Sequence, residues 1–106
     1  MRIFYIRAAE LEFESKLQRI AQRPFTTHSV SDFLQDIAHL ENEVRIHPGL
    51  RRVSGAPAGF FRVGPSPIYS YSLIYRLRDQ DAYVVAVAAP GRRPLYWNRR
   101  RIQESP

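Results

Sequence analysis

The chain of 106 residues contains no cysteine, a single lysine and no long apolar run. Without thiols it can form neither disulfides nor thiolate metal sites, which is compatible with a reducing compartment. No apolar segment approaches the length that spans a membrane, and the opening residues, MRIFYIRAAELEFE, lack the apolar core of an export signal. We therefore expect a cytoplasmic protein with no membrane partner.

The familiar motifs of enzyme active sites are also missing. The chain has no glycine-rich phosphate loop, no nucleophile-elbow pattern and no HExxH pair of metal ligands. Glu10, Glu12 and Glu14 are alternate residues of one expected helix, so their side chains point in different directions and favour a solvated first turn over acid–base chemistry. We expect no cofactor, no small-molecule substrate and no metal or catalytic role for the three histidines, His28, His39 and His47.

Positive charge is concentrated in the second half of the chain. The formal net charge is +6; residues 1–50 carry six basic and seven acidic side chains, whereas residues 51–106 carry ten and three. This asymmetry predicts an anionic partner for the second half, either nucleic acid or an acidic protein. Fifteen of the sixteen basic residues are arginine, which suits bidentate contact with phosphate or carboxylate, although a compositional bias of the source genome gives the same preference.

The first half has the pattern of a strand followed by two amphipathic helices. Residues 2–6, RIFYI, suit a short strand. Helical spacing begins at Ala8 and should end at Pro24; Ser29 can cap a second helix, which Pro48 and Gly49 stop. The apolar stripe of the first helix is Ala9, Phe13, Leu17, Ile20 and Ala21, and that of the second is Val30, Phe33, Leu34, Ile37, Leu40 and Val44. The two helices should form an antiparallel hairpin.

Three strands are expected in the second half. Residues 51–59, RRVSGAPAG, have the composition of a loop that begins with two arginines. Residues 60–63 suit a short strand, and residues 68–77 a long one with alternate apolar side chains. Residues 78–81, RDQD, form a hairpin-sized turn before residues 83–89, which are nearly all apolar, as expected of a strand covered on both faces.

These elements predict one α+β domain over residues 1–106. The helical hairpin should pack on one face of a small, mainly antiparallel sheet, with the first strand at an edge or beside the last, and a short basic helical tail should follow. The side chains expected in one common core are Phe13, Leu17, Phe33, Ile37, Leu73 and Val85.

The tail, GRRPLYWNRRR at residues 91–101, combines five arginines with a tyrosine and a tryptophan. Such a combination can neutralise phosphates and stack on bases. Alternatively, Pro94 starts a helical turn, Tyr96 and Trp97 cover the open end of the core, and the arginines are simply solvated. We favour the core position for Trp97 and a functional role for Arg92 and Arg93. Residues 98–106 can alternatively form a disordered basic end.

Residues 69–101 resemble the C-terminal half of the RelE/ParE superfamily, the small bacterial toxins of type II toxin–antitoxin pairs. Members of its ParE-like branch, which includes plasmid stabilisation proteins, carry a segment like RFPYxIYYRV, then a hairpin, then AVAHxRRxPxYWxxR. Here YSYSLIYRL at residues 69–77 occupies the first pattern, and the spacing of the second fits without a gap from Ala86 to Trp97. The residues that can be laid on the second pattern after AVA are Arg92, Arg93, Pro94, Tyr96, Trp97 and Arg100. The N-terminal AAELEFES also resembles the acidic opening helix of the family.

Two positions depart from the family pattern. Ser70 stands where proline is usual, and Ala89 stands where a histidine commonly precedes the arginines. Any role of that imidazole is lost here, which indicates either a divergent toxin or one that has lost activity.

The resemblance implies two alternative activities. ParE-like members poison DNA gyrase by binding it, whereas RelE-like members are ribosome-dependent mRNA endoribonucleases, whose arginines, lysines and a tyrosine stabilise charge on the phosphorane. The tail and the Tyr-Arg strand favour gyrase, with target-binding residues Arg76, Arg92, Arg93, Tyr96, Trp97, Arg99 and Arg100. For the ribonuclease alternative the catalytic cluster is Arg62, Arg76, Arg92, Arg93 and Tyr96. A plain basic nucleic-acid-binding module is the third possibility.

The resemblance also implies a cognate antitoxin as partner. A flexible acidic and apolar segment of such a protein could wrap the helical hairpin and cover the basic end of the sheet, gaining burial and charge complementarity. The sequence does not fix which surface the antitoxin covers.

Overall fold

The computed structural model describes residues 1–23 and 28–102. Its elements follow the predicted order of a strand, two helices and three strands, so the α+β prediction is confirmed. They are β1 (Ile3–Tyr5), α1 (Arg7–Ala21), α2 (Val30–Ile46), β2 (Phe61–Val63), β3 (Ser72–Arg78) and β4 (Asp81–Ala88). The helix stop assigned to Pro24 lies outside the described residues.

The four strands form one mixed sheet in the order β1-β4-β3-β2. β1 pairs parallel with β4, so it lies both at an edge and beside the last strand, and the other two pairings are antiparallel. The β3–β4 hairpin turns through Asp79 and Gln80, which have φ values of 51° and 70°. Positive φ at both central residues is the geometry that tight two-residue hairpins require.

β3 begins at Ser72, four residues later than the predicted strand start at Ile68. The backbone N–H groups of Ile68 and Tyr69 donate to the buried carboxylate of Asp36 on α2, at 3.2 and 2.7 Å, and so they are not available to a strand partner. Ser70 then has a φ of 59°. Proline, whose ring fixes φ near −65°, could not adopt this conformation, which accounts for the departure from the family pattern at this position.

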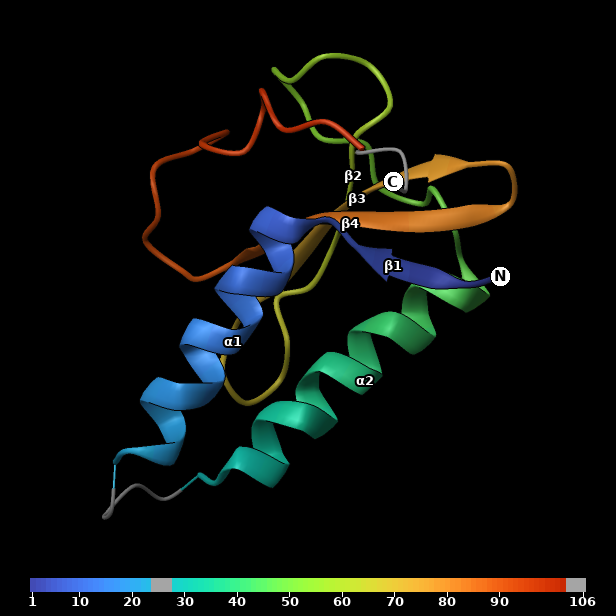
Figure 1. The fold of residues 1–106 in the computed structure, drawn as a ribbon. Helices are drawn as coiled ribbons and strands as arrows, with labels where there is room; N and C mark the ends of the chain where they lie inside the picture. The colour runs from blue at the N-terminus through green and yellow to red at the C-terminus, as the bar shows by residue number, and fades with distance from the viewer. Residues whose placement is uncertain (24–27, 103–106) are drawn as a thin grey trace.

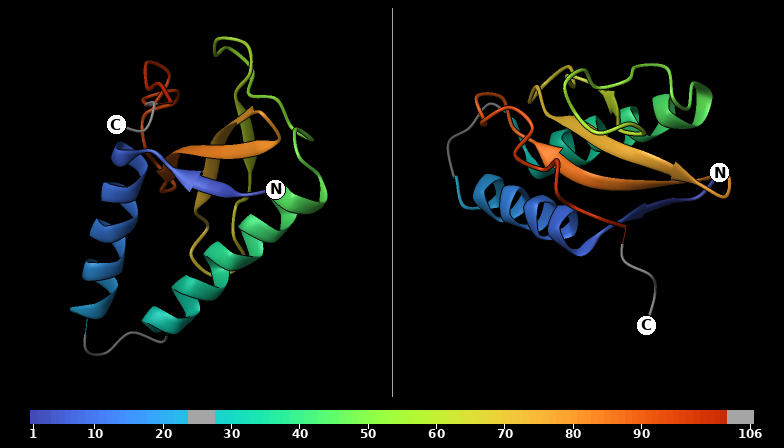
Figure 2. Two further views of the ribbon diagram at one scale, coloured as in Figure 1. Left: turned by 45° about the vertical axis from the view of Figure 1, so that its right-hand side comes forward. Right: turned by 90° about the horizontal axis from the view of Figure 1, so that it is seen from above.

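Both helices lie on one face of the sheet, whereas the 51–59 loop and the C-terminal segment lie on the other side (Figures 1 and 2). α1 packs against β4 and α2 against β2. The helices are closest where α1 ends and α2 begins, and they diverge from there, so the predicted hairpin is splayed (Figure 2). Ser29 caps α2, as the sequence predicts, and Asp32 completes a capping box, in which the Ser29 N–H donates to the Asp32 carboxylate at 2.8 Å.

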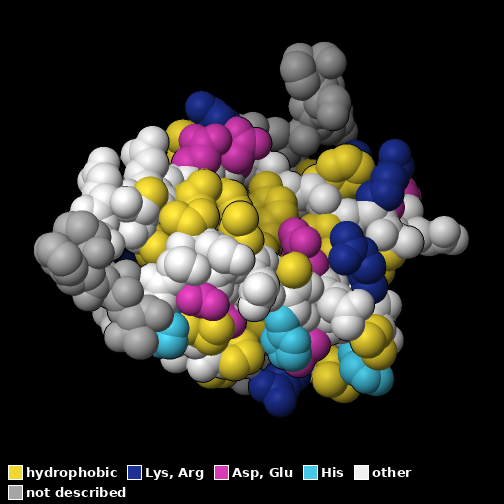
Figure 3. Space-filling model, turned by 90° about the horizontal axis from the view of Figure 1, so that it is seen from below, with side chains coloured by type: hydrophobic (Ala, Val, Ile, Leu, Met, Phe, Trp, Pro, Cys, Tyr) yellow, Lys and Arg dark blue, Asp and Glu magenta, His cyan; other side chains and the backbone are white. Residues whose placement is uncertain are grey.

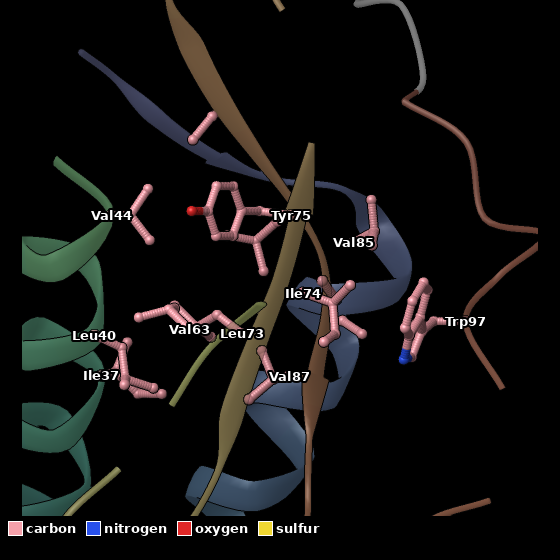
Figure 4. Packing of buried hydrophobic residues seen from close by; sticks show 14 of the residues in the cluster. Ile37, Leu40, Val44, Val63, Leu73, Ile74, Tyr75, Val85, Val87 and Trp97 are labelled. Carbon is pink, nitrogen blue, oxygen red and sulfur yellow. The ribbon is translucent and has the colours of Figure 1, made fainter. Parts of the chain in front are cut away.

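The predicted core is confirmed as one cluster. Phe33, Ile37, Leu73 and Val85 are buried in it, and Phe13 and Leu17 pack against it. Figure 4 shows Leu73 and Tyr75 directed toward Leu40 and Val44 of α2, while Ile74 lies on the side of Trp97. β4 is covered on both faces, as its continuous apolar sequence predicts, because each of its residues from Val84 to Val87 is buried.

Three positions on the helices differ from the predicted stripes. Lys16, which is not part of the predicted apolar stripe, is only 7% exposed, and its ammonium nitrogen lies 5.5 Å from the centroid of the Tyr71 ring. Ala21, the last residue of α1, is exposed. Leu34 is 45% exposed, because it lines a hollow between the helices and β1 instead of packing in the core. Among the described residues, no helix is long and apolar enough to cross a membrane.

Candidate anion-binding groove

A groove of about 570 Å³ opens on the side of the sheet opposite the helices. We call it the basic groove; it is lined by residues 51–54 and 88–97 together with Arg62 and Ile74. None of these lining residues carries a carboxylate. Five of them are arginines: Arg51, Arg52, Arg62, Arg92 and Arg93.

One wall of the basic groove is an extension of the sheet. The Arg62 N–H donates to the Arg51 carbonyl at 2.9 Å, and the Val53 N–H donates to the Phe60 carbonyl at 3.0 Å. Arg52 forms an isolated antiparallel bridge with Phe61. The sequence predicted only a loop here, but this pairing aligns its two arginines beside β2.

The other wall is the chain that follows β4. After Ala88 it turns back over the sheet, and the Trp97 ring packs on Phe60 with centroids 4.9 Å apart. Trp97 is 4% exposed, in agreement with its favoured position in the core rather than with direct target contact. Successive turns, with Asn98 N–H donating to Leu95 and Arg100 N–H to Trp97, take the place of the expected helical tail.

The arginines of the basic groove have few anionic neighbours. Within the described residues, the side chains of Arg51, Arg52 and Arg93 make no ion pair or hydrogen bond, and the side chain of Arg62 donates only to Ser72 Oγ, at 3.2 and 3.3 Å. Concentrated like charges in a concave surface attract an oppositely charged partner and raise the rate at which it associates. The groove therefore has the charge and the concave shape that suit an anionic partner.

A second group of charges lies at one end of the groove, and we call it the Glu12 network: Glu12, Arg92, Tyr96 and Arg100. Glu12, on α1, accepts hydrogen bonds from the Tyr96 hydroxyl at 2.7 Å and from Arg100 Nη1 at 2.8 Å. Arg92 Nη1 lies 4.0 Å from the same carboxylate. The guanidinium carbons of Arg92 and Arg100 lie 4.0 and 5.1 Å from the Tyr96 ring centroid.

These contacts shift the pKa of the Glu12 carboxyl and that of the Tyr96 hydroxyl in opposite directions. Burial opposes the ionised form of Glu12, but the hydrogen bonds from Arg100 and Tyr96 outweigh it and lower the pKa of the carboxyl. Burial and the hydrogen bond to Glu12 raise the pKa of Tyr96 above its ordinary value. The Tyr96 hydroxyl is thus a protonated donor already committed to Glu12.

The basic groove brings together four of the five residues predicted for the ribonuclease alternative, namely Arg62, Arg92, Arg93 and Tyr96. Arg76 does not line the groove: its guanidinium packs on the Phe60 ring at 4.8 Å and donates to the Ala58 carbonyl at 3.5 Å. Arg99 is exposed at the side of the tail, and Arg100 belongs to the Glu12 network. Ala89 lines the groove at the position of the family histidine.

Sequence reasoning missed the role of Glu12, which it assigned to a solvated first turn. The side chain is 12% exposed. The spacing of Glu12 in the helix indicates that its side chain is buried, because it lies three residues after Ala9 and four before Lys16, on the same face of α1. The i to i+4 pair of His39 and Glu43, with nitrogen and oxygen 3.1 Å apart, was also overlooked. No group of three or more potential metal ligands occurs in the described part of the chain.

A separate hollow of about 520 Å³ lies between the diverging helices and β1, and we call it the helical groove. Seen from below, hydrophobic side chains gather on this face beside acidic ones (Figure 3). Tyr5 donates its hydroxyl to Glu41 at 2.8 Å at its rim. The lining residues are Ile3, Phe4, Tyr5, Glu10, Phe13, Leu34, Ile37, Ala38 and Glu41.

The fold is shared with a solved structure described as the chromosomal ParDE TA system from P. aeruginosa. The match has a TM-score of 0.65 at 14% sequence identity, and it covers 84% of this chain and 95% of that chain. At this identity the likeness concerns the fold, and it supports the RelE/ParE-like architecture that the sequence predicted. No protein-family model and no curated protein sequence matches the chain.

Proposed function

We propose that this protein is the toxin of a toxin–antitoxin pair and that it acts by binding an anionic target through the basic groove. The observation that carries the proposal is the set of five arginines around one groove without a lining carboxylate. The fold shared with a ParDE chain supports the same assignment. Of the residues predicted for target binding, Arg92, Arg93, Tyr96 and Trp97 line this groove.

Binding is favoured over covalent chemistry because the groove lacks a group suited to proton transfer near neutral pH. Its lining residues include no histidine, lysine or carboxylate, and Ala89 occupies the place of the family imidazole. Tyr96 is a poor base, since its hydroxyl donates to Glu12 and its pKa is raised. The favoured target is therefore DNA gyrase, poisoned by association alone.

An antitoxin is the second partner in this proposal. The helical groove is apolar, and Leu34 at its margin is 45% exposed, so an apolar segment of the antitoxin would gain burial there. Glu10 and Glu41 at the rim favour a segment that also carries a basic residue. Acidic residues elsewhere in the antitoxin would neutralise the basic groove.

One observation favours a second candidate function. Arg62, Arg92, Arg93 and Tyr96 line a single groove, which is the arrangement that a ribosome-dependent ribonuclease needs to stabilise charge on a scissile phosphate. A basic nucleic-acid-binding module without toxicity would use the same arginines for phosphate contacts only.

The proposal is tested first in cells and then with purified components. Induced expression should arrest bacterial growth, and co-expression of the neighbouring gene product should relieve the arrest. Purified protein should inhibit gyrase supercoiling and leave ribosome-bound mRNA intact. Cut mRNA with unaffected gyrase would replace the favoured mechanism by the ribonuclease, and two blank assays at high protein concentration would leave the binding module.

A further inference from the structure

A row of aromatic and cationic side chains crosses the face of the sheet opposite the helices. Phe4 of β1 is paired with Tyr83 of β4, and Tyr83 is paired with Arg76 of β3 in the register of the sheet. Side chains alternate between the two faces along a strand, and cross-strand partners share a face. Because the neighbouring Tyr5 reaches Glu41 on α2, Phe4 and its partners in the row lie on the other face.

Neighbours in this row are close in space. The Phe4 and Tyr83 rings are stacked, with centroids 5.2 Å apart and an angle of 24° between their planes. At the β1 end, the Arg2 guanidinium carbon lies 5.2 Å from the Phe4 centroid. Tyr83 and Arg76 are directly opposite on adjacent strands, where Cβ atoms are roughly 4.5–5.5 Å apart. We call these four residues, Arg2, Phe4, Tyr83 and Arg76, the sheet row.

The sheet row is accessible, most of all at its β1 end. Phe4 is 38% exposed, and the Arg2 side chain is 78% exposed. Tyr83 and Arg76 are half-buried. The stacked ring pair therefore keeps aromatic surface in contact with water, and a flat ligand that covered this surface would gain burial.

The two arginines of the sheet row differ in how their charges are compensated. Asp81 accepts from the Arg2 backbone N–H and from Arg2 Nη2, both at 3.1 Å, and so fixes the position of Arg2. Arg76 donates to the Ala58 carbonyl at 3.5 Å and is in no ion pair within the described residues. Arg76 therefore places an uncompensated positive charge next to Tyr83, and this charge favours an anionic ligand.

The sheet row continues into the basic groove. The Arg76 guanidinium carbon lies 4.8 Å from the centroid of Phe60, and the Phe60 ring packs on Trp97 at 4.9 Å. Trp97 lines the basic groove, which has five arginines and no carboxylate. A chain molecule with charged and flat groups can therefore place its charges in the groove and its flat groups on the sheet row.

We propose that the sheet row is a stacking surface for the bases of single-stranded nucleic acid whose phosphates lie in the basic groove. Bases stack on aromatic rings whatever the sequence, and arginine attracts the backbone. A single strand fits better than a duplex, because only unpaired bases can turn out to stack on protein rings. An apolar protein surface would use the two rings but not the arginines. This inference goes beyond the proposed function, since it requires neither toxicity nor gyrase.

The test compares two strands that carry the same phosphates. A fluorescent deoxythymidine strand of about ten nucleotides and an abasic strand of equal length are each titrated with the purified protein, and anisotropy measures both affinities. We expect the intact strand to bind about tenfold more tightly, because only this strand has bases to stack. Equal affinities for the two strands, or no binding of either strand, would overturn the proposal.

Ring variants assign the difference to the sheet row. Phe4→Leu and Tyr83→Leu keep apolar volume and remove the ring, so each should weaken the intact strand about fivefold and leave the abasic strand unchanged. Unchanged binding of the abasic strand also shows that the variant is folded. Phe61→Leu is the matched control, because Phe61 packs on Tyr75 on the helical face of the sheet. Losses of equal size in all three variants, or no loss in either ring variant, would contradict the site.

A charge variant tests the contribution of Arg76. Arg76→Gln should weaken the intact and the abasic strand alike, and the loss should shrink as salt rises. Arg45→Gln, at an exposed position on α2, removes the same charge and should leave both affinities unchanged. Equal losses in the two variants would indicate net charge and not a site. A uridine strand in the same titration shows whether RNA binds more tightly than DNA.

Sedimentation of the same proteins tests a different occupant of this face. Self-association of the wild type that Phe4→Leu abolishes, with no difference between the two strands, would assign the face to a second copy of the chain and overturn the proposal. None of these measurements uses gyrase or an antitoxin. Their failure would leave the proposed function untouched, and a protein without toxicity can still bind a strand in this way.

Discussion

Arg100 bridges Glu12 and Val85: its Nη1 lies 2.8 Å from Glu12 Oε1 and 2.9 Å from the Val85 carbonyl oxygen. The pairing of β1 ends at Tyr5 opposite Val84, so the outer edge of β4 continues beyond its partner. Glu12 also accepts from the backbone N–H of Val87 on this edge, at 3.0 Å. The C-terminal tail and α1 thereby cover backbone groups that would otherwise be free to pair with another chain.

Replacing Glu12 by alanine should destabilise the fold by about 2–4 kcal/mol, because it leaves Arg100 and the Val87 N–H without their buried acceptor. Urea unfolding followed by circular dichroism measures the loss. Glu14→Ala, an exposed carboxylate on the same helix, should change stability by no more than about 0.5 kcal/mol. Equal values for the two variants would contradict a structural role for the Glu12 network.

The same carboxylate should contribute to acid sensitivity. The folded pKa of Glu12 lies below its ordinary value of 4.5, so its contribution is complete above about pH 4.5 and is lost as the pH falls through the folded pKa. Asp81, whose pKa is lowered by hydrogen bonds from the Arg2 backbone and side chain, acts in the same direction. The relevant measurement is the difference in unfolding free energy between wild type and Glu12→Gln from pH 7 to 3, which should narrow on acidification. A constant difference would assign the stabilisation to packing instead.

Removing the Trp97 ring should cost about 3–5 kcal/mol, since the residue is buried against Phe60. Trp97→Phe keeps most of the contact and should lose much less than Trp97→Ala. Thermal unfolding of both variants, with exposed Arg99→Ala as a control, distinguishes them. Full stability of Trp97→Ala would place this ring on the surface rather than in the core.

The charge of the basic groove should affect target binding without affecting the fold. Arg52 and Arg93 have no side-chain partner within the described residues, so their double replacement by alanine should alter stability by no more than about 0.5 kcal/mol. Binding to gyrase should weaken, and the effect should shrink as salt rises. Arg92 is a less clean probe because it packs on Tyr96. A matched loss of two exposed charges, Arg7→Ala with Arg45→Ala, should leave binding unchanged; equal weakening by both pairs would indicate net charge alone.

A charge introduced into the helical groove should weaken the antitoxin complex. Leu34→Glu places a carboxylate in an apolar hollow that already contains Glu10 and Glu41, and we expect a loss of about tenfold or more in antitoxin affinity. Leu50→Glu, at a residue 69% exposed and outside this groove, is the control. Calorimetric titration and rescue of growth both measure the effect. Unchanged affinity in Leu34→Glu would place the antitoxin elsewhere.

The fold was largely predictable because its signals are local. Ser29 with Asp32 marks the start of α2, and the apolar run at residues 83–89 marks a doubly covered strand. The late start of β3 was not predictable, because it depends on Asp36, more than thirty residues away, accepting from Ile68 and Tyr69. Sequence patterns record the period of a segment and not the partners that its backbone finds across the fold.

The site was predictable only in part, for the same reason. Arg92 and Arg93 were identified from a contiguous motif, whereas Arg51 and Arg52 join the groove only through their pairing beside β2. Glu12 and Arg100 meet across most of the chain, and neither residue type is unusual at its own position. The resemblance to a family identified the basic tail. Only the structure shows that Trp97 and Arg100 in this tail support the fold, whereas the Arg93 side chain has no partner within the described residues.

The parallel pairing of Ile3 with Ala82 has a consequence for how the chain is made. During translation the first strand leaves the ribosome well before its partner, and at about 5–20 residues per second the delay is on the order of ten seconds. Throughout that interval α1 cannot pack on β4, and Glu12 cannot form its hydrogen bond with Arg100. The basic groove needs residues from both 51–54 and 88–97, so it cannot form on a nascent chain until synthesis has passed residue 97.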